Sequence, residues 1–307
     1  MRIVYMGTPD FAVSCLERLH SLGHEIAGVF CQPDKPQGRK MILTAPPVKE
    51  KALELSLPVF QPATLRNGEA LEILKQLNPD LIVVVAYGKI LPREILELPK
   101  HGCINIHASL LPQLRGAAPI QWAVINGLKK TGVTSMLMDE GLDTGDMLLK
   151  AEVEIGENET SAELWDRLSI LAAQVLEETI EKLQKGELVR TKQDDSKSTY
   201  APLLSKSISE VDWNESAQNV HNKIRGLYSW PCAVTTIQDK VIKLMSSRLA
   251  EGSGKAGEIV ESNGKLVIAC GDGRCVEILS LQAQGKKVMN SADYLRGNPI
   301  DKGLIII

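Results

Sequence analysis

The chain has 307 residues, with 35 Lys and Arg against 38 Asp and Glu, and a formal net charge of −3 at pH 7. This length suits one large or two ordinary domains, and a hydrophobic content of 44% is enough for a sizeable buried core. The near-neutral composition excludes nucleic-acid binding through bulk charge, so any such site must be a local patch.

Nothing in the sequence indicates a membrane or a metal. The longest strongly apolar run, Leu81–Ala86, is far too short to span a bilayer. The N-terminus reaches Pro9 before the apolar region of a signal peptide develops. Six cysteines are scattered without a CxxC pair, which favours free thiols in a reducing compartment. We therefore expect a cytoplasmic protein with no metal site and no membrane association.

The first third of the chain alternates between strand and helix patterns. The apolar runs that predict strands are Arg2–Met6, Glu25–Cys31, Leu81–Ala86 and Cys103–Ile106. Helical spacing occupies Phe11–Leu22, Val48–Leu55 and Gly68–Leu77, and a loop rich in proline and glycine is expected at Gln32–Pro47. Unbroken Ile and Val runs separated by helices predict a parallel sheet covered on both faces. The fold class is therefore α/β, a doubly wound, Rossmann-like domain.

The second half changes character. Thr160–Lys185 is amphipathic at helical spacing, and the polar stretch 190–205 reads as a linker. Beyond it, short apolar runs are separated by Asn263-Gly264 and Asp272-Gly273, which are strong hairpin signals. We expect a catalytic domain over residues 1–189 and a small, OB-like β-barrel over 206–307. The barrel segment carries 13 Lys and Arg against 11 Asp and Glu, so it is the mildly basic part.

Three polar residues stand out around the strand at Cys103–Ile106. Asn105 and His107 are two positions apart, so they project from one face if the strand continues through His107. Open α/β sheets bind ligands at the carboxyl ends of their strands. Asp143 follows in a glycine-rich loop. The sequence therefore predicts a ligand site at this edge of the sheet.

An amide, an imidazole and a carboxylate are suited to acyl transfer onto an amine. The first two can donate hydrogen bonds to a developing oxyanion, and the carboxylate can hold the imidazole and help move the proton of the amine. Taken from the residues alone, other interpretations stay open. Asn105 can cap a strand, His107 can be a structural hydrogen bonder and Asp143 can form a turn.

The ordered motifs of the chain resemble those of a known family. Asn105-Ile106-His107-Ala108-Ser109-Leu110-Leu111-Pro112, then Arg115-Gly116, then Gly141-Leu142-Asp143-Thr144-Gly145 is similar to the signature of folate-dependent formyltransferases. Met1–Ala12 and Lys223–Pro231 resemble the methionyl-tRNA branch of that family. The resemblance covers essentially the whole chain.

The resemblance implies a reaction and its residues. Asn105, His107 and Asp143 are expected to be catalytic, and 10-formyltetrahydrofolate is the expected co-substrate, without a metal. The residues expected to bind the folate are Ser109, Leu110, Leu111, Pro112, Ala86, Tyr87, Gly88, Asp139 and Glu140.

The same resemblance implies initiator methionyl-tRNA as the acceptor. In that branch the Gln32–Pro47 loop reaches the acceptor end of the tRNA, and here it contains Arg39 and Lys40. Both residues suit phosphate contacts, although a solvated surface loop is the alternative. Lys206, at the start of the barrel segment, is a third expected tRNA contact. We expect the protein to be a monomer.

Four other functions are alternatives. A glycinamide-ribonucleotide formyltransferase usually ends after the catalytic domain, and a formyltetrahydrofolate hydrolase module normally continues into an aldehyde dehydrogenase. A dinucleotide oxidoreductase needs G-x-G-x-x-G after the first strand, whereas residues 7–12 contain the single glycine Gly7. A non-catalytic RNA-binding protein remains as the non-enzyme alternative.

Overall fold

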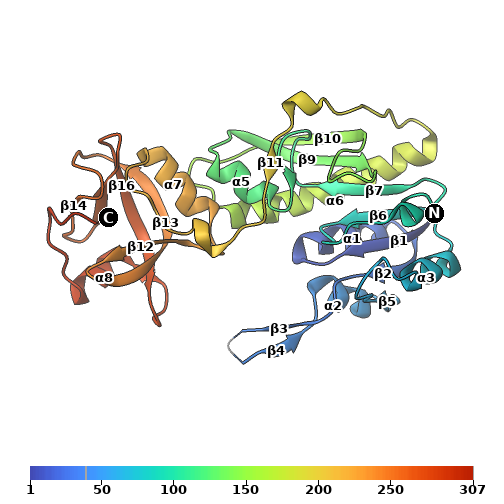
Figure 1. Cartoon of the computed structure of the whole chain (residues 1–307), viewed down its shortest axis with the longest axis horizontal. Coiled ribbons are helices and arrows are strands. Elements are labelled where there is room, and N and C mark those ends of the chain that lie inside the picture. Colours follow the sequence, from blue (N-terminus) through green and yellow to red (C-terminus); the bar gives the residue numbers. More distant parts are fainter. Residues whose placement is uncertain (39, 307) are drawn as a thin grey trace. The chain divides into compact units, whose positions relative to one another are not determined.

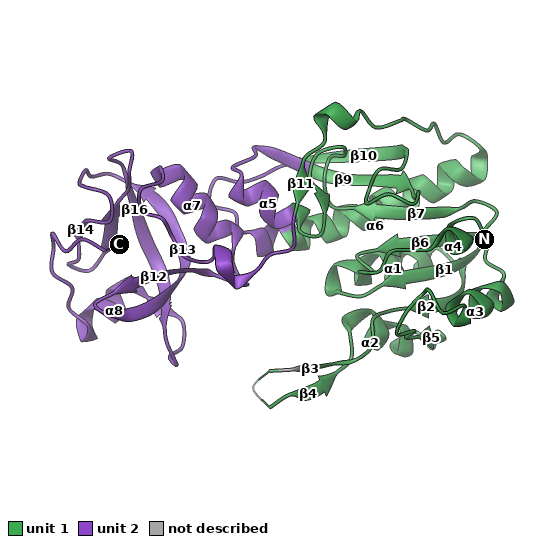
Figure 2. Ribbon diagram, in the orientation of Figure 1, with its two compact units in different colours: residues 1–119, 132–153, 165–201 green, residues 120–131, 154–164, 202–307 purple. Residues whose placement is uncertain are grey.

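A computed structural model describes residues 1–38 and 40–306 of the chain (Figure 1). The chain divides into two compact units, coloured separately in Figure 2. Unit 1 comprises Met1–Pro119, Gly132–Val153 and Trp165–Ala201. Unit 2 comprises Ile120–Thr131, Glu154–Leu164 and the chain from Pro202 onward.

Unit 1 is built on a seven-stranded sheet with the order β10-β9-β7-β6-β1-β2-β5. Its strands are β1 (Arg2–Gly7), β2 (Glu25–Phe30), β5 (Val59–Phe60), β6 (Leu81–Val85), β7 (Cys103–His107), β9 (Lys130–Leu137) and β10 (Met147–Glu154). The five strands from β7 to β5 in this order are parallel, whereas β9 pairs with β7 in the antiparallel direction. The predicted parallel sheet is confirmed, and strands β9 and β10, which the apolar runs do not predict, extend it at the β7 edge.

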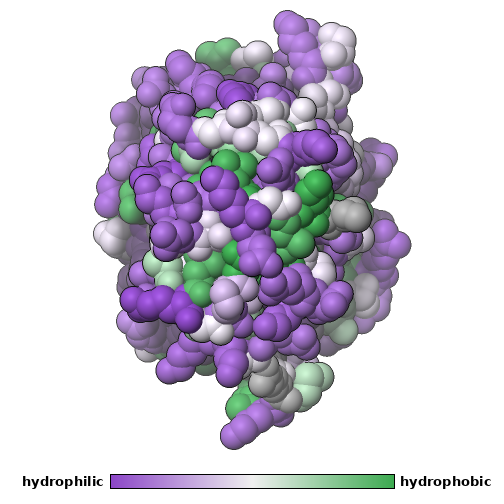
Figure 3. Space-filling model, turned by 90° about the vertical axis from the view of Figure 1, so that its left-hand side faces the viewer, coloured by the Kyte–Doolittle hydropathy of each residue, from purple (hydrophilic) through white to green (hydrophobic). Residues whose placement is uncertain are grey.

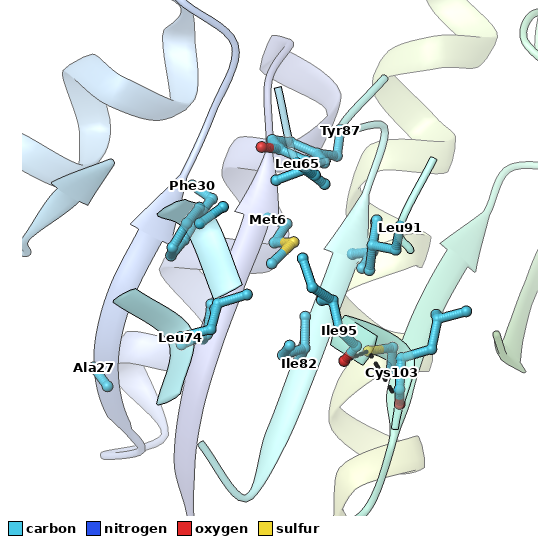
Figure 4. Close-up of a cluster of buried hydrophobic side chains, with 14 residues drawn as sticks. Met6, Ala27, Phe30, Leu65, Leu74, Ile82, Tyr87, Leu91, Ile95 and Cys103 are labelled. Atoms are coloured by element: carbon cyan, nitrogen blue, oxygen red, sulfur yellow. Dashed lines mark hydrogen bonds between the residues drawn. The ribbon is translucent and has the colours of Figure 1, made fainter. Parts of the chain in front are cut away.

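Helices cover both faces of this sheet. The helices of unit 1 are α1 (Val13–Ser21), α2 (Pro47–Glu54), α3 (Glu69–Leu77), α4 (Arg93–Leu96) and most of α6 (Ser161–Lys185), with a short 3-10 turn at Asp10–Ala12. Met6 of β1 and Ile82 of β6 lie in a buried cluster with Leu74 of α3 and Ile95 of α4 (Figure 4). Tyr5, which alternates with Met6 along β1, instead donates a hydrogen bond to the carbonyl of Ala12 beside α1. The predicted doubly wound fold is therefore confirmed.

Helix α6 begins where the sequence pattern predicts it. The Thr160 hydroxyl accepts a hydrogen bond from the Glu163 backbone N–H at 3.3 Å, and the Glu163 carboxylate accepts from the Thr160 N–H at 2.8 Å. This reciprocal pair is a capping box, which satisfies backbone donors that a helix start leaves free. The Thr160 hydroxyl also donates to the Glu163 carboxylate at 2.8 Å, and the backbone and hydroxyl hydrogen bonds from Thr160 lower the pKa of Glu163 because they favour the ionised carboxylate.

The predicted Gln32–Pro47 loop contains regular structure of its own. A short antiparallel hairpin is formed by β3 (Lys35–Gln37) and β4 (Ile42–Thr44). The root of this hairpin is held by Asp34, which accepts two 2.8 Å hydrogen bonds from the Lys49 ammonium of α2. The hydrogen bonds from Lys49 lower the pKa of the Asp34 carboxyl, because they favour its ionised form.

Unit 2 contains a curled antiparallel sheet with the order β12-β13-β16-β15-β14, and β17 pairs with β16. Its strands are β12 (Ala233–Ile237), β13 (Lys240–Ala250), β14 (Ile259–Glu261), β15 (Leu266–Ala269), β16 (Cys275–Ala283) and β17 (Met289–Asn290). Its helices include α7 (Ala217–Gly226), α8 (Ser291–Gly297) and α5 (Pro119–Ile125), of which only Pro119 belongs to unit 1. The hairpins predicted at Asn263-Gly264 and Asp272-Gly273 are confirmed by antiparallel pairing of β14 with β15 and of β15 with β16.

Figure 3 shows the face of the molecule that lies on the left-hand side of Figure 1. This face is mainly hydrophilic, with hydrophobic residues near its middle. Exposed apolar side chains of unit 2 include Leu203, Trp230, Val241, Val288 and Ile305. Across the described residues, none of the helices has the length and apolar character needed to cross a bilayer.

Candidate active site

Strand β7 brings Asn105 and His107 to one edge of the unit 1 sheet. Asn105 pairs with Val84 of β6 and with Met136 of β9, so its backbone is fixed on both sides. Its side chain is half-buried, and no hydrogen bond joins its side-chain amide to another described residue. His107 ends the strand with a side chain that is 7% exposed. The predicted alternation along this strand places both residues on one face.

His107 has two different neighbours at its two ring nitrogens. Its Nε2 lies 2.9 Å from the carbonyl oxygen of Leu114. Since a carbonyl can only accept, Nε2 must carry a proton and donate it. Its Nδ1 lies 3.8 Å from Oδ2 of Asp143, which is an ion-pair distance rather than a hydrogen bond. The structure thus brings together the predicted histidine and carboxylate, with Nδ1 turned toward the carboxylate.

Asp143 is held in an unusual backbone conformation. Its φ is 82°, in the left-handed region that residues other than glycine seldom adopt. Its Oδ2 accepts a 2.8 Å hydrogen bond from the Gly116 backbone N–H. At Gly145, a Cβ would lie 1.8 Å from the carbonyl oxygen of Leu137, so only glycine allows this loop to approach β9. The carboxylate is 12% exposed, so it is largely shielded from solvent.

Gln193, which no sequence motif indicates, completes this loop together with Arg115 of the signature. Gln193, in the polar stretch after α6, donates hydrogen bonds to the carbonyls of Asp143 and Gly145 at 2.7 and 2.8 Å. Its own carbonyl accepts two hydrogen bonds from the Arg115 guanidinium, at 2.8 and 3.1 Å. Nothing in the local pattern around Gln193 indicates burial, because it lies among charged and hydroxyl residues.

The Ser109–Pro112 segment forms a turn that is held by Thr134 of β9. The Thr134 hydroxyl of β9 donates to the Ser109 carbonyl at 2.7 Å and accepts from the Leu111 N–H at 3.1 Å. Ser109 and Leu111 are buried, and the Ser109 hydroxyl donates to the Gln113 carbonyl at 2.6 Å. Leu110 and Pro112 are partly exposed. These last two are therefore the members of the segment that a ligand can reach directly.

The Ala86-Tyr87-Gly88 segment follows β6 at the point where the strand order reverses around β1. The Tyr87 carbonyl accepts hydrogen bonds from the Thr8 hydroxyl and the Gln32 side-chain amide, both at 3.0 Å. Ala86 and Gly88 are exposed, whereas the Tyr87 ring is buried and burial raises its pKa. Exposed backbone at a topological switch point is where such sheets bind ligands.

Asp139 and Glu140 lie on the exposed loop between β9 and β10. Asp139 accepts hydrogen bonds from the Gly141 N–H at 3.0 Å and the Thr144 hydroxyl at 2.7 Å. These contacts order the loop that carries Asp143. Glu140 lies 3.7 Å from the Arg93 guanidinium, and both of these side chains are well exposed. Exposed pairs of this kind contribute little to stability.

The residues expected to contact tRNA are distributed over both units. Lys40 is exposed in the turn between β3 and β4, next to the exposed apolar side chains Met41, Ile42 and Leu43. Arg39 lies outside the described residues. Lys206 is exposed in a 3-10 turn of unit 2.

Two family profiles match the chain. One is described as formyl transferase and matches residues 1–180, and the other is described as formyl transferase, C-terminal domain, and matches residues 203–299. These matches, with the fold described above, define the chain as a formyl transferase.

The relatives narrow the family further. A protein named methionyl-tRNA formyltransferase from Alkaliphilus oremlandii is 52% identical, covering 100% of this chain and 99% of that protein. One of the same name from Caldanaerobacter subterraneus is 48% identical, covering 100% of both. The chain belongs to the methionyl-tRNA formyltransferase family.

A solved structure supports the fold independently. An N-formyltransferase from Helicobacter canadensis, in complex with folinic acid and dTDP-3-aminofucose, has a TM-score of 0.71 and 19% identity. The match covers 92% of this chain and 99% of that one. At this identity the likeness shows that the two chains share a fold.

Proposed function

We propose that this enzyme transfers the formyl group of 10-formyltetrahydrofolate to the free amino group of methionyl initiator tRNA, for translation initiation. The observation that carries the chemistry is the placement of His107 beside Asp143 at the end of β7, two residues after Asn105. Family membership supports the choice of donor and acceptor.

The reaction requires a carbon–nitrogen bond to form at the methionyl amine and another to break at the folate nitrogen. When the amine attacks the formyl carbon, the formyl oxygen becomes negatively charged. The Asn105 amide and a protonated His107 Nδ1 are the side-chain donors for that oxygen. A single donor of this kind is worth about 3–4 kcal/mol in a transition state. Neither step needs a covalent intermediate with the protein.

Asp143 supplies the charge that this arrangement needs. Because His107 donates its Nε2 proton to Leu114, Nδ1 gains a proton only when the ring becomes an imidazolium. The Asp143 carboxylate, 3.8 Å away, stabilises that positive charge. The proton lost by the attacking amine passes through these two groups to the departing folate nitrogen.

The folate fits the chemistry of the segments around this pair. A pterin ring offers N–H donors and a carbonyl acceptor, which suit the exposed backbone at Ala86 and Gly88 and the carboxylates of Asp139 and Glu140. Leu110 and Pro112 present apolar surface nearby in the chain. These residues would hold the donor, and Asn105 and His107 would orient its formyl oxygen.

For the acceptor, Arg39, Lys40 and Lys206 would contact tRNA phosphates, which position a nucleic acid without reading its sequence. We propose that the enzyme acts as a monomer in the cytoplasm.

The deciding experiment offers labelled 10-formyltetrahydrofolate with three acceptors in parallel: methionyl initiator tRNA, glycinamide ribonucleotide, and water alone. We expect label on the aminoacyl-tRNA only. Label on the nucleotide, or release of formate alone, would retain the His107–Asp143 chemistry and overturn the acceptor. An RNA-binding protein without catalysis would transfer no label, and its RNA affinity would tolerate loss of His107 or Asp143.

A further inference from the structure

One buried side chain, that of Gln193, connects the loop that carries Asp143 to other segments of unit 1. Gln193 is 6% exposed, although it lies in a polar stretch that the sequence suggests is a linker. It uses both N–H donors and its carbonyl oxygen, with four hydrogen bonds to Asp143, Gly145 and Arg115. A buried amide with its hydrogen bonds fully satisfied has one preferred position.

The two donated hydrogen bonds fix the backbone on both sides of Thr144. The Asp143 carbonyl is bound at 2.7 Å and the Gly145 carbonyl at 2.8 Å. Asp143 has a φ of 82°, a conformation that persists only when its surroundings hold it. The Gln193 amide is therefore part of what keeps the Asp143 side chain directed at His107.

The two hydrogen bonds that Gln193 accepts hold Arg115, next to the residue that binds the Asp143 carboxylate. Arg115 precedes Gly116, whose N–H donates to Asp143 Oδ2 at 2.8 Å. Gln193 therefore holds the backbone of Asp143 through its donors and the segment that binds the Asp143 carboxylate through its acceptor. A shift of Gln193 would displace both at once.

Gln193 is itself held at both ends of its segment. Thr191 exchanges two backbone hydrogen bonds with Met147 of β10, each 2.9 Å long. Farther along, Asp195 accepts a 2.7 Å hydrogen bond from Arg115. These contacts make the start of the polar stretch part of the catalytic framework of unit 1.

From these contacts we infer that Gln193 is a positioning residue for formyl transfer, acting through Asp143 and without contact to either substrate. This inference rests on the proposed role of Asp143. A misplacement of about 1 Å in a catalytic group costs on the order of 100-fold in rate.

The test uses two substitutions in the full chain. Gln193→Glu keeps the size of the side chain and an acceptor for Arg115 but removes both N–H donors, and Gln193→Ala removes all four hydrogen bonds. We expect kcat to fall by roughly 10- to 100-fold in each, with little change in KM for folate or tRNA. The matched controls are Gln282→Glu and Gln282→Ala, because the Gln282 amide also donates to a backbone carbonyl, that of Lys286 at 2.9 Å in unit 2. They should retain wild-type kcat.

A double substitution separates positioning from a general structural effect. If Gln193 acts through Asp143, adding Gln193→Glu to Asp143→Ala produces no further loss of kcat. A multiplicative loss in the double variant, or wild-type kcat in Gln193→Glu, would overturn the inference. If Gln193→Ala fails to fold, Gln193→Glu still decides the question. Wild-type kcat in Asp143→Ala alone would instead refute the proposed role of Asp143, which is a different failure.

Discussion

The His107 imidazole donates from Nε2 to the Leu114 carbonyl across 2.9 Å, and this contact fixes the tautomer of the neutral ring. Leu114 is itself fixed, since its N–H donates to the Thr199 hydroxyl at 2.9 Å. Only Nδ1 remains to exchange a proton, and it lies 3.8 Å from the Asp143 carboxylate. Leu114, which lies between Pro112 and Arg115 of the two motif segments, thus leaves Nδ1 as the ring nitrogen that faces Asp143.

Replacing Asp143 by Asn should remove the charge while keeping the shape of the side chain. We expect kcat for formyl transfer to fall by about 10²- to 10⁴-fold, because the imidazolium loses its counter-ion. Steady-state kinetics with methionyl-tRNA would measure this, and thermal unfolding would verify that the variant folds. A wild-type kcat would show that the carboxylate charge plays no part.

Replacing Asn105 by Ala should remove one donor to the oxyanion. The expected loss is about 10²- to 10³-fold in kcat, with the affinity for folate retained, because the hydrogen bond strengthens in the transition state. Asn67→Ala is a suitable control, since Asn67 lies on an exposed loop and its side chain forms hydrogen bonds with the nearby Glu69. Equal kcat values for the two variants would remove Asn105 from the mechanism.

The sequence predicts the sheet and the strand that carries Asn105 and His107 well, because both depend on local signals. Unbroken apolar runs identify β6 and β7, and the period of two places Asn105 and His107 together. The contacts of Leu114 and Gln193 depend instead on chain segments that lie far apart in sequence: Leu114 meets Thr199, and Gln193 meets Asp143. No local pattern encodes such pairings, and the polarity around Gln193 argues for exposure.

Gly116 offers a direct test of how closely β8 (Arg115–Gly116) packs on β11 (Tyr200–Ala201). Its φ is 114°, and a Cβ would lie 2.7 Å from both the Ala201 carbonyl oxygen and the Tyr200 ring. Gly116→Ala should therefore lower stability by about 1–3 kcal/mol for overpacking, beyond the cost of the backbone conformation. It should also lower kcat, because the Gly116 N–H holds Asp143.

The matched control for that substitution is Gly23→Ala. Gly23 has a φ of 75° but no atom within 4 Å of its ideal Cβ, so it isolates the conformational cost. That cost is about 1–2 kcal/mol. Denaturant unfolding of both variants would separate the two contributions. Equal destabilisation would mean that the contact with β11 relaxes without cost.

The basic residues expected to contact tRNA predict a change in salt dependence. Arg39→Ala, Lys40→Ala and Lys206→Ala should each weaken tRNA binding and leave folate binding unchanged. Each lost phosphate contact should reduce the slope of log K against log salt by about 0.7–0.9. Binding titrations over a range of salt concentrations would measure the slope. An unchanged slope would show that the substituted residue makes no phosphate contact.

His221 predicts a loss of stability in unit 2 under mildly acidic conditions. The ring is 2% exposed, with Nε2 donating to the Glu157 carbonyl at 3.1 Å and Nδ1 accepting from the Ser247 hydroxyl at 2.9 Å. Both contacts satisfy the neutral imidazole. Burial, with a contribution from the positive charge of Arg225, lowers the pKa of His221 from its ordinary 6.5, although the hydrogen bond to Glu157 opposes this shift.

The sign of the effect follows from proton linkage. Between 6.5 and the lower folded pKa, the unfolded chain binds a proton at His221 that the folded chain does not. The free energy of unfolding therefore falls as the pH drops below 6.5, with a slope of at most about 1.4 kcal/mol per pH unit from this residue. Denaturant unfolding from pH 7.5 to 5 should show a shallower decline in His221→Gln than in the wild type, whereas His20→Gln, at an exposed position on α1, should match the wild-type slope. A His221→Gln slope as steep as that of the wild type would assign the acid sensitivity to other groups.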